Sequence, residues 1–288
     1  MTEYLPILYA ILALGGLGVL FGLLLGVADK KFSVEVDERV SAIRAAVAGA
    51  NCGACGYPGC DGYAEAVVRG DAPANACTPG GAKTAKAVAA IMGVDAAAMQ
   101  PLVARVRCQG TCENVTMRYD YSGIPSCRAA GSLAGGPTAC EFGCVGLGDC
   151  VDRCPFGAIS MIDGVAVING EVCTGCGMCV ATCPRGIIQM LPKEQTVTVL
   201  CRNKATGRIA RLQCKTACVA CKLCEKQCPT NSICVVNGIA KIDESTCTCC
   251  GACIPVCPKH CIVSYYEHDL VGELAATAQA ELLNADID

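Results

Sequence analysis

The chain begins with a long apolar stretch and then alternates short amphipathic segments with turns rich in glycine and cysteine. Residues 5–28 contain no charged side chain and are long enough to cross a bilayer as a helix. Residues 37–48 carry apolar side chains at helical spacing, and residues 63–68 form a second helix-like run. The pattern predicts a membrane helix followed by a small helical domain.

Two later segments, 158–168 and 232–242, have strand-like residues on both sides of a turn dipeptide. The dipeptides are Asp163-Gly164 and Asn237-Gly238, which favour two-residue β-hairpin turns. These hairpins lie between cysteine runs and predict two similar α+β units in tandem. Apolar residues at helical spacing between 270 and 283 predict a helical tail, which could pack on the body or on a partner.

The charges that follow the apolar stretch predict its orientation. Lys30 and Lys31 come directly after it, and the positive-inside rule keeps them in the cytoplasm. Gly18, Gly22 and Gly26 recur every fourth residue, so they predict a helix face that docks against another membrane helix. A buried core helix is the alternative. On the membrane interpretation the chain is a single-pass protein of the cell (inner) membrane, with everything after residue 31 in the cytoplasm.

Cysteine is unusually frequent, with 28 of 288 residues. Disulfides, zinc sites and iron–sulfur clusters are the competing explanations. A reducing cytoplasm disfavours disulfides, so the thiols are expected to bind metal. The net charge of −3 and the lack of a basic run give no support for a nucleic-acid partner.

The first cysteine set lies in the sequence NCGACGYPGC and has the spacing C-x2-C-x4-C-x16-C. Glycines in this loop relieve crowding, so the backbone can wrap a bulky inorganic core. Four thiolates suit a [4Fe–4S] cluster, and they also suit zinc. The members of this set are Cys52, Cys55, Cys60 and Cys77.

Three later runs share the spacing C-x2-C-x2-C-x3-C-P of bacterial ferredoxins, and a fourth set is looser, with its first two gaps stretched. Repetition of this motif favours iron–sulfur clusters over zinc. The three runs are Cys173, Cys176, Cys179 and Cys183; Cys218, Cys221, Cys224 and Cys228; and Cys247, Cys250, Cys253 and Cys257. The looser set is Cys140, Cys144, Cys150 and Cys154.

Ferredoxin runs work in pairs, because the fourth cysteine of each run binds the cluster of the other run. Cys154 to Cys173 and Cys228 to Cys247 both span 19 positions, which indicates two equal units. With the N-terminal set, the crossover predicts five [4Fe–4S] clusters. The predicted pairs are Cys140, Cys144, Cys150 and Cys183 with Cys154, Cys173, Cys176 and Cys179, and Cys218, Cys221, Cys224 and Cys257 with Cys228, Cys247, Cys250 and Cys253.

Eight cysteines lie outside these sets. Three of them align with non-cysteine positions of the first unit, and we interpret them as small buried apolar residues: Cys234, Cys249 and Cys261. The other five could form a sixth metal site, with two alternative sets of ligands. Either Cys108, Cys127, Cys201 and Cys214 converge, or Cys108, Cys112 and Cys127 find a fourth partner.

Five clusters in one chain predict a conduit for single electrons. The sequence has neither a dinucleotide fingerprint after a strand nor a Walker motif, so nicotinamide and flavin chemistry is assigned to partner chains. No catalytic residue is expected in this chain. The expected fold class is multi-domain α+β: an anchor at 1–31, a four-cysteine helical domain at 32–100, ferredoxin-like units at 101–192 and 193–266, and a tail at 267–288.

A glycine-rich membrane helix, then NCGACGYPGC with Cys77, then ferredoxin runs, resembles the B subunit of the Rnf complex over essentially the whole chain. The resemblance implies a membrane-bound ferredoxin:NAD⁺ oxidoreductase that couples electron flow to Na⁺ or H⁺ translocation. This chain would accept electrons from reduced ferredoxin and relay them to flavin-bearing membrane partners. Simpler members carry one ferredoxin unit, whereas this chain has two. The stretched loop from Cys140 to Cys150 departs from the pattern and leaves that cluster's type open.

Two other functions compete with this one. One is a polyferredoxin subunit of another membrane hydrogenase or dehydrogenase, which the N-terminal four-cysteine domain disfavours. The other is a zinc-stapled membrane scaffold without redox work. Lysines beside one cluster run would steer an acidic ferredoxin, or are ordinary solvated residues. They are Lys215, Lys222, Lys226 and Lys259.

Overall fold

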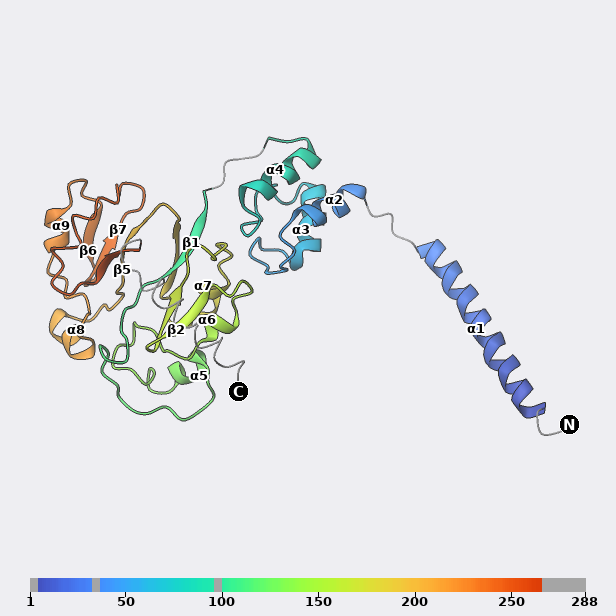
Figure 1. Ribbon diagram of the computed structural model, residues 1–288, viewed down its shortest axis with the longest axis horizontal. Helices are drawn as coiled ribbons and strands as arrows, with labels where there is room; N and C mark the ends of the chain where they lie inside the picture. The colour runs from blue at the N-terminus through green and yellow to red at the C-terminus, as the bar shows by residue number, and fades with distance from the viewer. Residues whose placement is uncertain (1–4, 33–36, 96–99, 266–288) are drawn as a thin grey trace, which may run out of the picture.

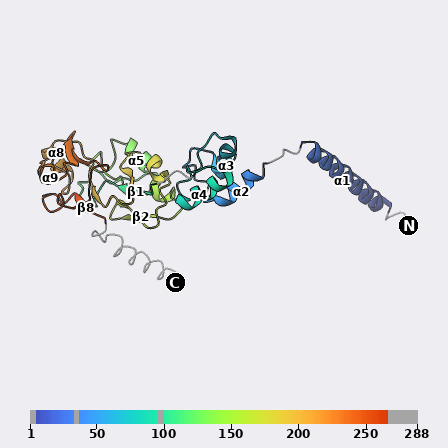
Figure 2. The ribbon, with the colours of Figure 1, turned by 90° about the horizontal axis from the view of Figure 1, so that it is seen from above.

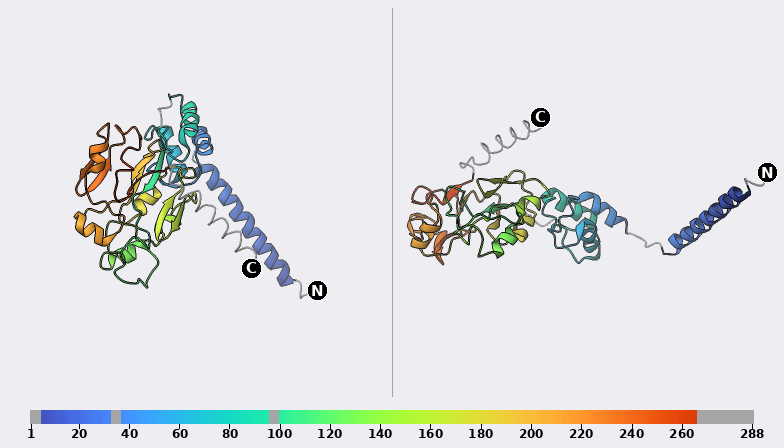
Figure 3. Two further views of the ribbon diagram at one scale, coloured as in Figure 1. Left: turned by 60° about the vertical axis from the view of Figure 1, so that its left-hand side comes forward. Right: turned by 90° about the horizontal axis from the view of Figure 1, so that it is seen from below.

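The computed structural model describes residues 5–32, 37–95 and 100–265; within the first helix it describes the side chains of residues 9, 12–28, 30 and 31. Figure 1 shows three parts in chain order: a separate N-terminal helix, a small helical domain, and a larger body that holds the strands. The same order is seen from above and from below (Figures 2 and 3). The predicted C-terminal helical tail lies outside the described residues.

Helix α1 (Leu5–Phe32) covers the predicted apolar stretch and has Lys30 and Lys31 in its last turn. The large apolar side chains described between Leu12 and Val27 are all more than half exposed. A Cβ atom added at the three aligned glycines would meet no atom within 4 Å, so that face is open. No helix in the described part of the chain combines the length and apolar character needed to span a membrane.

The helical domain contains α2 (Glu38–Ala46), α3 (Gly59–Arg69) and α4 (Gly81–Met92). Asp37 starts α2 by accepting a hydrogen bond from the backbone N–H of Arg39 at 2.9 Å. The apolar stripes of the three helices meet in one core, where Ile43, Tyr63 and Val88 are fully buried. This core supports the loop that carries the first cysteine set.

The α+β body is built from four two-stranded antiparallel sheets, paired β1–β4, β2–β3, β5–β8 and β6–β7. Its strands are β1 (Leu102–Val106), β2 (Ile159–Ile162), β3 (Val165–Ile168), β4 (Ile188–Pro192), β5 (Val197–Val199), β6 (Ile233–Val236), β7 (Ile239–Ile242) and β8 (Ile262–Ser264). Its helices are α5 (Cys127–Ser132), α6 (Asp149–Asp152), α7 (Met178–Thr182), α8 (Gly207–Gln213) and α9 (Leu223–Gln227).

The sheets divide into two tandem units, two sheets within residues 102–192 and two within 197–264. Both predicted hairpins are confirmed, because β2 pairs with β3 and β6 pairs with β7 across two-residue loops. Asp163, Gly164, Asn237 and Gly238 all have positive φ, from 45° to 81°, as such turns require. The turn chemistry therefore sets the register of both hairpins.

The two units are joined by hydrogen bonds between distant segments. The Thr116 N–H donates to the carbonyl of Gln213 at 3.0 Å, and the Thr116 hydroxyl donates to the carbonyl of Leu212 at 2.8 Å. Nε of Arg107 donates to the carbonyl of Val199 at 3.3 Å. These contacts bring the segment after β1 beside the ends of α8 and β5. A cysteine follows each of these three elements, so the contacts also bring cysteines of both units near one another.

Gly175 lies where the first unit leaves no room for a side chain. Its φ is 71°, and a Cβ atom there would collide with the carbonyl group of Leu102. We expect Gly175→Ala to lower the thermal unfolding midpoint by at least roughly 4 °C, because left-handed backbone alone costs an alanine about 1–2 kcal/mol. Scanning calorimetry of the cluster-loaded chain measures this. The matched control is Cys249→Gly at the tandem position, where φ is already 54°; an equal loss there would contradict the explanation.

Candidate metal centres

The first cysteine set lies in the loop between α2 and α3, in the first turn of α3 and in the segment that follows α3. Gly53, Gly56 and Gly59 have φ values of 71°, 85° and 86°, a conformation that glycine adopts without steric cost. The Cys60 N–H donates to Oδ1 of Asn51 at 2.9 Å, which fixes the end of the loop. Cys77 is buried in the core of the helical domain, with Cys55 and Cys60 packed against the same core.

Both predicted thiol sets of the second unit are brought together by the structure. One set surrounds a hollow with about 330 Å³ of space free of protein atoms, part of it open to solvent. The other surrounds a similar hollow of about 320 Å³. The fourth cysteine of each run crosses to the hollow of the other run, as in two-cluster ferredoxins. The two sets are Cys218, Cys221, Cys224 and Cys257, and Cys228, Cys247, Cys250 and Cys253.

The first unit differs from the predicted crossover at one position. A hollow of about 390 Å³ is lined by Cys127, Cys144, Cys150 and Cys183, so Cys127 stands where Cys140 was expected. Cys140 instead points into a separate hollow. The reason lies in the tandem alignment, since Leu147 occupies the place that Cys221 holds 74 positions later. A thiol from α5 takes over that role.

Asp149 connects Cys127 to the ferredoxin loop. Its Oδ1 accepts the backbone N–H of Cys127 at 2.9 Å, and its Oδ2 accepts the hydroxyl of Ser126 at 3.0 Å. Because Asp149 directly precedes Cys150, these bonds tie α5 to the start of α6. The carboxylate therefore positions the Cys127 thiol beside the other three.

The fourth set, Cys154 with the run from Cys173 to Cys179, comes together in the first unit. The pKa of Cys179 is raised to about 11. Burial is the largest cause, and the nearby thiols of Cys173, Cys176 and Cys154 raise it further. Burial and then the neighbouring thiol of Cys52 raise the pKa of Cys176.

Backbone N–H groups point at sulfur in the same way in both units. The Ala158 N–H donates to Sγ of Cys154 at 3.4 Å, and the Ser232 N–H donates to Sγ of Cys228 at 3.3 Å. These two donors are 74 positions apart, as are their acceptors. Hydrogen bonds of this kind stabilise negative charge on thiolate ligands and help to set a cluster's potential.

Burial is the main influence on the third cysteine of each ferredoxin-type run. It raises the pKa of Cys150 to about 12 and the pKa values of Cys179, Cys224 and Cys253 to about 11. Without metal these thiols are neutral at pH 7. Metal binding must therefore displace their protons, so loading of these sites is expected to weaken as the pH falls.

Cys261 lies beside two thiols of the second unit without being part of their set. It is buried, and its Sγ is 3.5 Å from Sγ of Cys257. Hydrogen bonding to Cys261 lowers the pKa of Cys257 to about 5 and the pKa of Cys218 to about 6, and holds the pKa of Cys261 far above its usual range. When Cys257 and Cys218 bind metal as thiolates, the S–H of Cys261 is the group that can donate a hydrogen bond to them.

We expect Cys261→Ala to make the potential of the neighbouring cluster more negative by an amount on the order of tens of mV, because one hydrogen bond that favours the reduced state is lost. A redox titration followed by EPR measures this shift. Cys234→Ala is the matched control, since Cys234 is exposed on β6. An unchanged potential in Cys261→Ala would exclude the tuning role.

The cysteines expected to be buried apolar residues are divided by the structure. Cys261 is buried, but Cys234 is exposed and Cys249 is half-buried, so that expectation is wrong for the latter two. Cys249 instead lies near the carbonyl of Glu194, 3.8 Å from its sulfur. Cys112 is exposed against the turn of the first hairpin, where a Cβ on Gly164 would come within 2.8 Å of its sulfur.

Among the described residues no three Cys, His, Asp or Glu side chains are placed to hold a single metal ion. A cubane cluster binds each thiolate through a different iron, so its ligands surround a hollow. The three hollows of the ferredoxin runs are each lined by four or five thiols, since Cys261 and Cys249 also line two of them. The residues present therefore fit [4Fe–4S] clusters, and together with the tandem hairpins they define a ferredoxin-like iron–sulfur protein.

Comparison with known proteins agrees with this class. A family model for an Fe–S cluster domain matches residues 48–79, and models for 4Fe-4S dicluster domains match residues 139–188 and 172–232. The chain is 42% identical to the B subunit of the ion-translocating oxidoreductase complex of Methanosarcina acetivorans, over 88% of this chain and 96% of that protein.

Two further relatives cover most of both chains. The B subunit of the Na⁺-translocating ferredoxin:NAD⁺ oxidoreductase complex of Acetobacterium woodii is 46% identical over 88% of this chain and 77% of its own length. The proton-translocating counterpart of Clostridium ljungdahlii is 40% identical over 85% of this chain and 88% of its own length. The chain therefore belongs to the family of B subunits of ion-translocating Rnf oxidoreductase complexes, and the resemblance found in the sequence is confirmed.

Proposed function

We propose that this chain relays electrons within a membrane-bound ferredoxin:NAD⁺ oxidoreductase that translocates Na⁺ or H⁺. The observation that carries the proposal is the set of thiol-lined hollows in the two ferredoxin-like units. One of these hollows lies in the first unit and two lie in the second unit, which gives a series of sites for metal clusters. Bound clusters would take up and release single electrons along this series, and the protein's part is to position and tune them.

The proposed relay uses five [4Fe–4S] clusters. Support comes from backbone N–H groups that donate to Sγ of Cys154, Cys173 and Cys228, as they do to thiolate ligands. The proposed ligand sets are Cys52, Cys55, Cys60 and Cys77; Cys127, Cys144, Cys150 and Cys183; Cys154, Cys173, Cys176 and Cys179; Cys218, Cys221, Cys224 and Cys257; and Cys228, Cys247, Cys250 and Cys253.

Reduction by ferredoxin tests the proposal directly. The full-length chain, purified in detergent without oxygen, should contain iron and sulfide and lose visible absorbance when reduced ferredoxin is added. EPR of the reduced sample should then show [4Fe–4S] signals. Zinc in place of iron, or clusters that reduced ferredoxin leaves oxidised, would contradict the relay function.

Attachment to lipid is assigned to α1. Residues 5–28 are uncharged, the described apolar side chains from Leu12 to Val27 are exposed, and two lysines follow. Such a segment buries its side chains in lipid and keeps its lysines at the cytoplasmic surface. The open glycine face of α1 suits close packing with a helix of another subunit, and flavin-bearing membrane subunits of the complex are the expected partners.

Ferredoxin is proposed to dock beside Cys221, which is exposed, as are Lys222 and Lys226 of the α9 region that follows it. We expect the double charge reversal to glutamate to slow cluster reduction by an acidic ferredoxin about tenfold at low salt, because steering is lost. The rate is measured as a function of ferredoxin concentration and ionic strength.

The matched control reverses Lys83 and Lys86, which are exposed on α4 of the helical domain. This variant has the same net charge as the first, so it separates local steering from overall charge. Equal slowing in both variants would place the docking surface elsewhere.

A further inference from the structure

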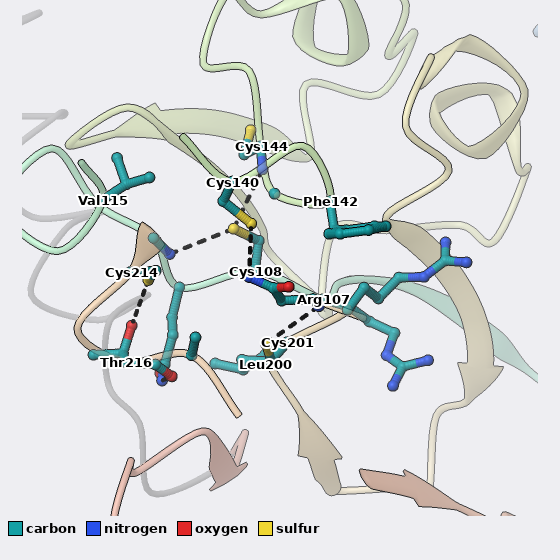
Figure 4. A pocket seen from close by; sticks show the side chains of 16 residues that line it. Arg107, Cys108, Val115, Cys140, Phe142, Cys144, Leu200, Cys201, Cys214 and Thr216 are labelled. Carbon is teal, nitrogen blue, oxygen red and sulfur yellow. Dashed lines mark hydrogen bonds between the residues drawn. The ribbon is translucent and has the colours of Figure 1, made fainter. Parts of the chain in front are cut away.

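A further hollow lies at the junction of the two ferredoxin-like units. It encloses about 380 Å³ of space free of protein atoms, part of it open to solvent, which lies within the 320 to 390 Å³ of the three hollows formed by the ferredoxin runs. Figure 4 shows thiols from four separate segments around it. They are Cys108, Cys140, Cys201 and Cys214.

The thiols come in equivalent pairs, one pair from each unit. Cys108 and Cys201 each lie two residues after a first strand, β1 or β5. Cys140 and Cys214 are 74 positions apart, the same offset that relates the ferredoxin runs of the two units. The hollow is therefore bounded by the same two positions of the fold, used once by each unit.

The hydrogen bonds to these thiols repeat with the pairs. Sγ of Cys108 accepts the N–H of Gly110 at 3.4 Å and that of Cys144 at 3.3 Å. Sγ of Cys201 accepts the N–H of Asn203 at 3.5 Å and that of Cys218 at 3.3 Å. Two N–H donors on one sulfur are the surroundings of a charged thiolate ligand, and here they occur twice.

Polar side chains contact the sulfur atoms of the other two cysteines. Nδ2 of Asn203, itself fully buried, lies 3.5 Å from Sγ of Cys140, and the Thr216 hydroxyl lies 3.3 Å from Sγ of Cys214. Gly143 keeps the wall clear, because a Cβ there would come within 3.4 Å of two of the sulfurs. Cys144 also lines this hollow, but it belongs with Cys127, Cys150 and Cys183.

We propose that Cys108, Cys140, Cys201 and Cys214 bind a sixth [4Fe–4S] cluster that bridges the two units, an inference that extends the proposed relay function. The donors Cys144 and Cys218 are ligands of the neighbouring sets on either side, so each neighbour is one N–H···S contact away. The bridging cluster takes one electron from a neighbour, which is oxidised, and gives it to the other neighbour, which is reduced.

Iron counting on paired variants tests the shared site. The full-length protein is purified anaerobically, and iron and sulfide are measured per chain. Cys108→Ala and Cys201→Ala lie in different units, yet each should remove about four of about 24 irons. The double variant should lose no more than either single variant, because both thiols serve one cluster.

The comparison pair is Cys108→Ala with Cys127→Ala, which should lose about eight irons because two clusters are affected. Cys112→Ala should lose none. EPR spin counting on the same samples separates loss of one cluster from collapse of the fold, since the other signals should persist.

Three results would overturn the sixth cluster. The first is an unchanged iron content in Cys108→Ala and Cys201→Ala, and the second is zinc bound by these four thiols in the wild-type protein. The third is a double variant that loses the sum of the two single losses. Those results would leave the five-cluster relay intact, whereas an iron-free wild-type chain would overturn both.

Discussion

Replacing Cys127 by alanine is expected to remove one cluster from the first unit and to stop electron flow between the two units. Its thiol lines one hollow with Cys144, Cys150 and Cys183, and no other described thiol lies there to replace it. The chain should lose about four irons, measured with acid-labile sulfide after anaerobic purification. Pre-steady-state reduction by ferredoxin should then reach the clusters of only one unit.

The matched comparison for this result is Asp149→Asn, which keeps the side-chain size but weakens the bonds that hold the Cys127 loop to α6. That variant should contain the cluster after purification. It should release the iron of this cluster faster than the wild-type protein when a chelator is added. If Cys127→Ala retained full iron, the ligand set predicted from the sequence, with Cys140, would be restored and the arrangement proposed here would fail.

Removing residues 1–31 is expected to release the chain from the membrane completely. Each leucine side chain that lipid covers contributes about 1.5–3 kcal/mol, and α1 has several in its exposed apolar stretch. The shortened chain should be brown and hold the same iron per chain, because α1 contributes no cysteine. Fractionation by ultracentrifugation measures the effect.

The full-length chain and the shortened chain are each expressed without any other subunit. Sedimentation with membranes then depends only on this chain. A shortened chain that still sediments with membranes, or a full-length chain that remains in the supernatant, would contradict the anchor assignment.

The hairpins and most thiol sets could be predicted because local chemistry determines them. Asp163-Gly164 and Asn237-Gly238 set their own turns, and the C-x2-C-x2-C-x3-C-P spacing brings three thiols around one loop. The helix expected over residues 37–48 from its apolar spacing is also found, as Glu38–Ala46, and Asp37 caps its first turn.

The role of Cys127 could not be predicted, because it depends on a contact between residues far apart in the sequence. Asp149 draws α5 onto the ferredoxin loop across 22 positions, and no spacing rule describes that bond. The signal that was available is the missing thiol at Leu147, which left the first unit one ligand short.

Only part of the hollow at the junction of the two units, lined by Cys108, Cys140, Cys201 and Cys214, could be predicted from the sequence. The 74-position offset between Cys140 and Cys214 matches the tandem repeat, but Cys108 and Cys201 are 93 positions apart. The difference of 19 residues reflects the longer segment between Cys108 and Cys140, part of which pairs with the segment around Cys214. An insertion between equivalent positions hides them from any fixed-period comparison.

The duplicated N–H···S pattern at the junction has a consequence for how such a chain can be divided. Either half, produced alone, would present two thiols on one open face. A chain cut between residues 192 and 197 should therefore hold the sixth cluster only when both halves are present together, because neither half carries more than two of its four thiols.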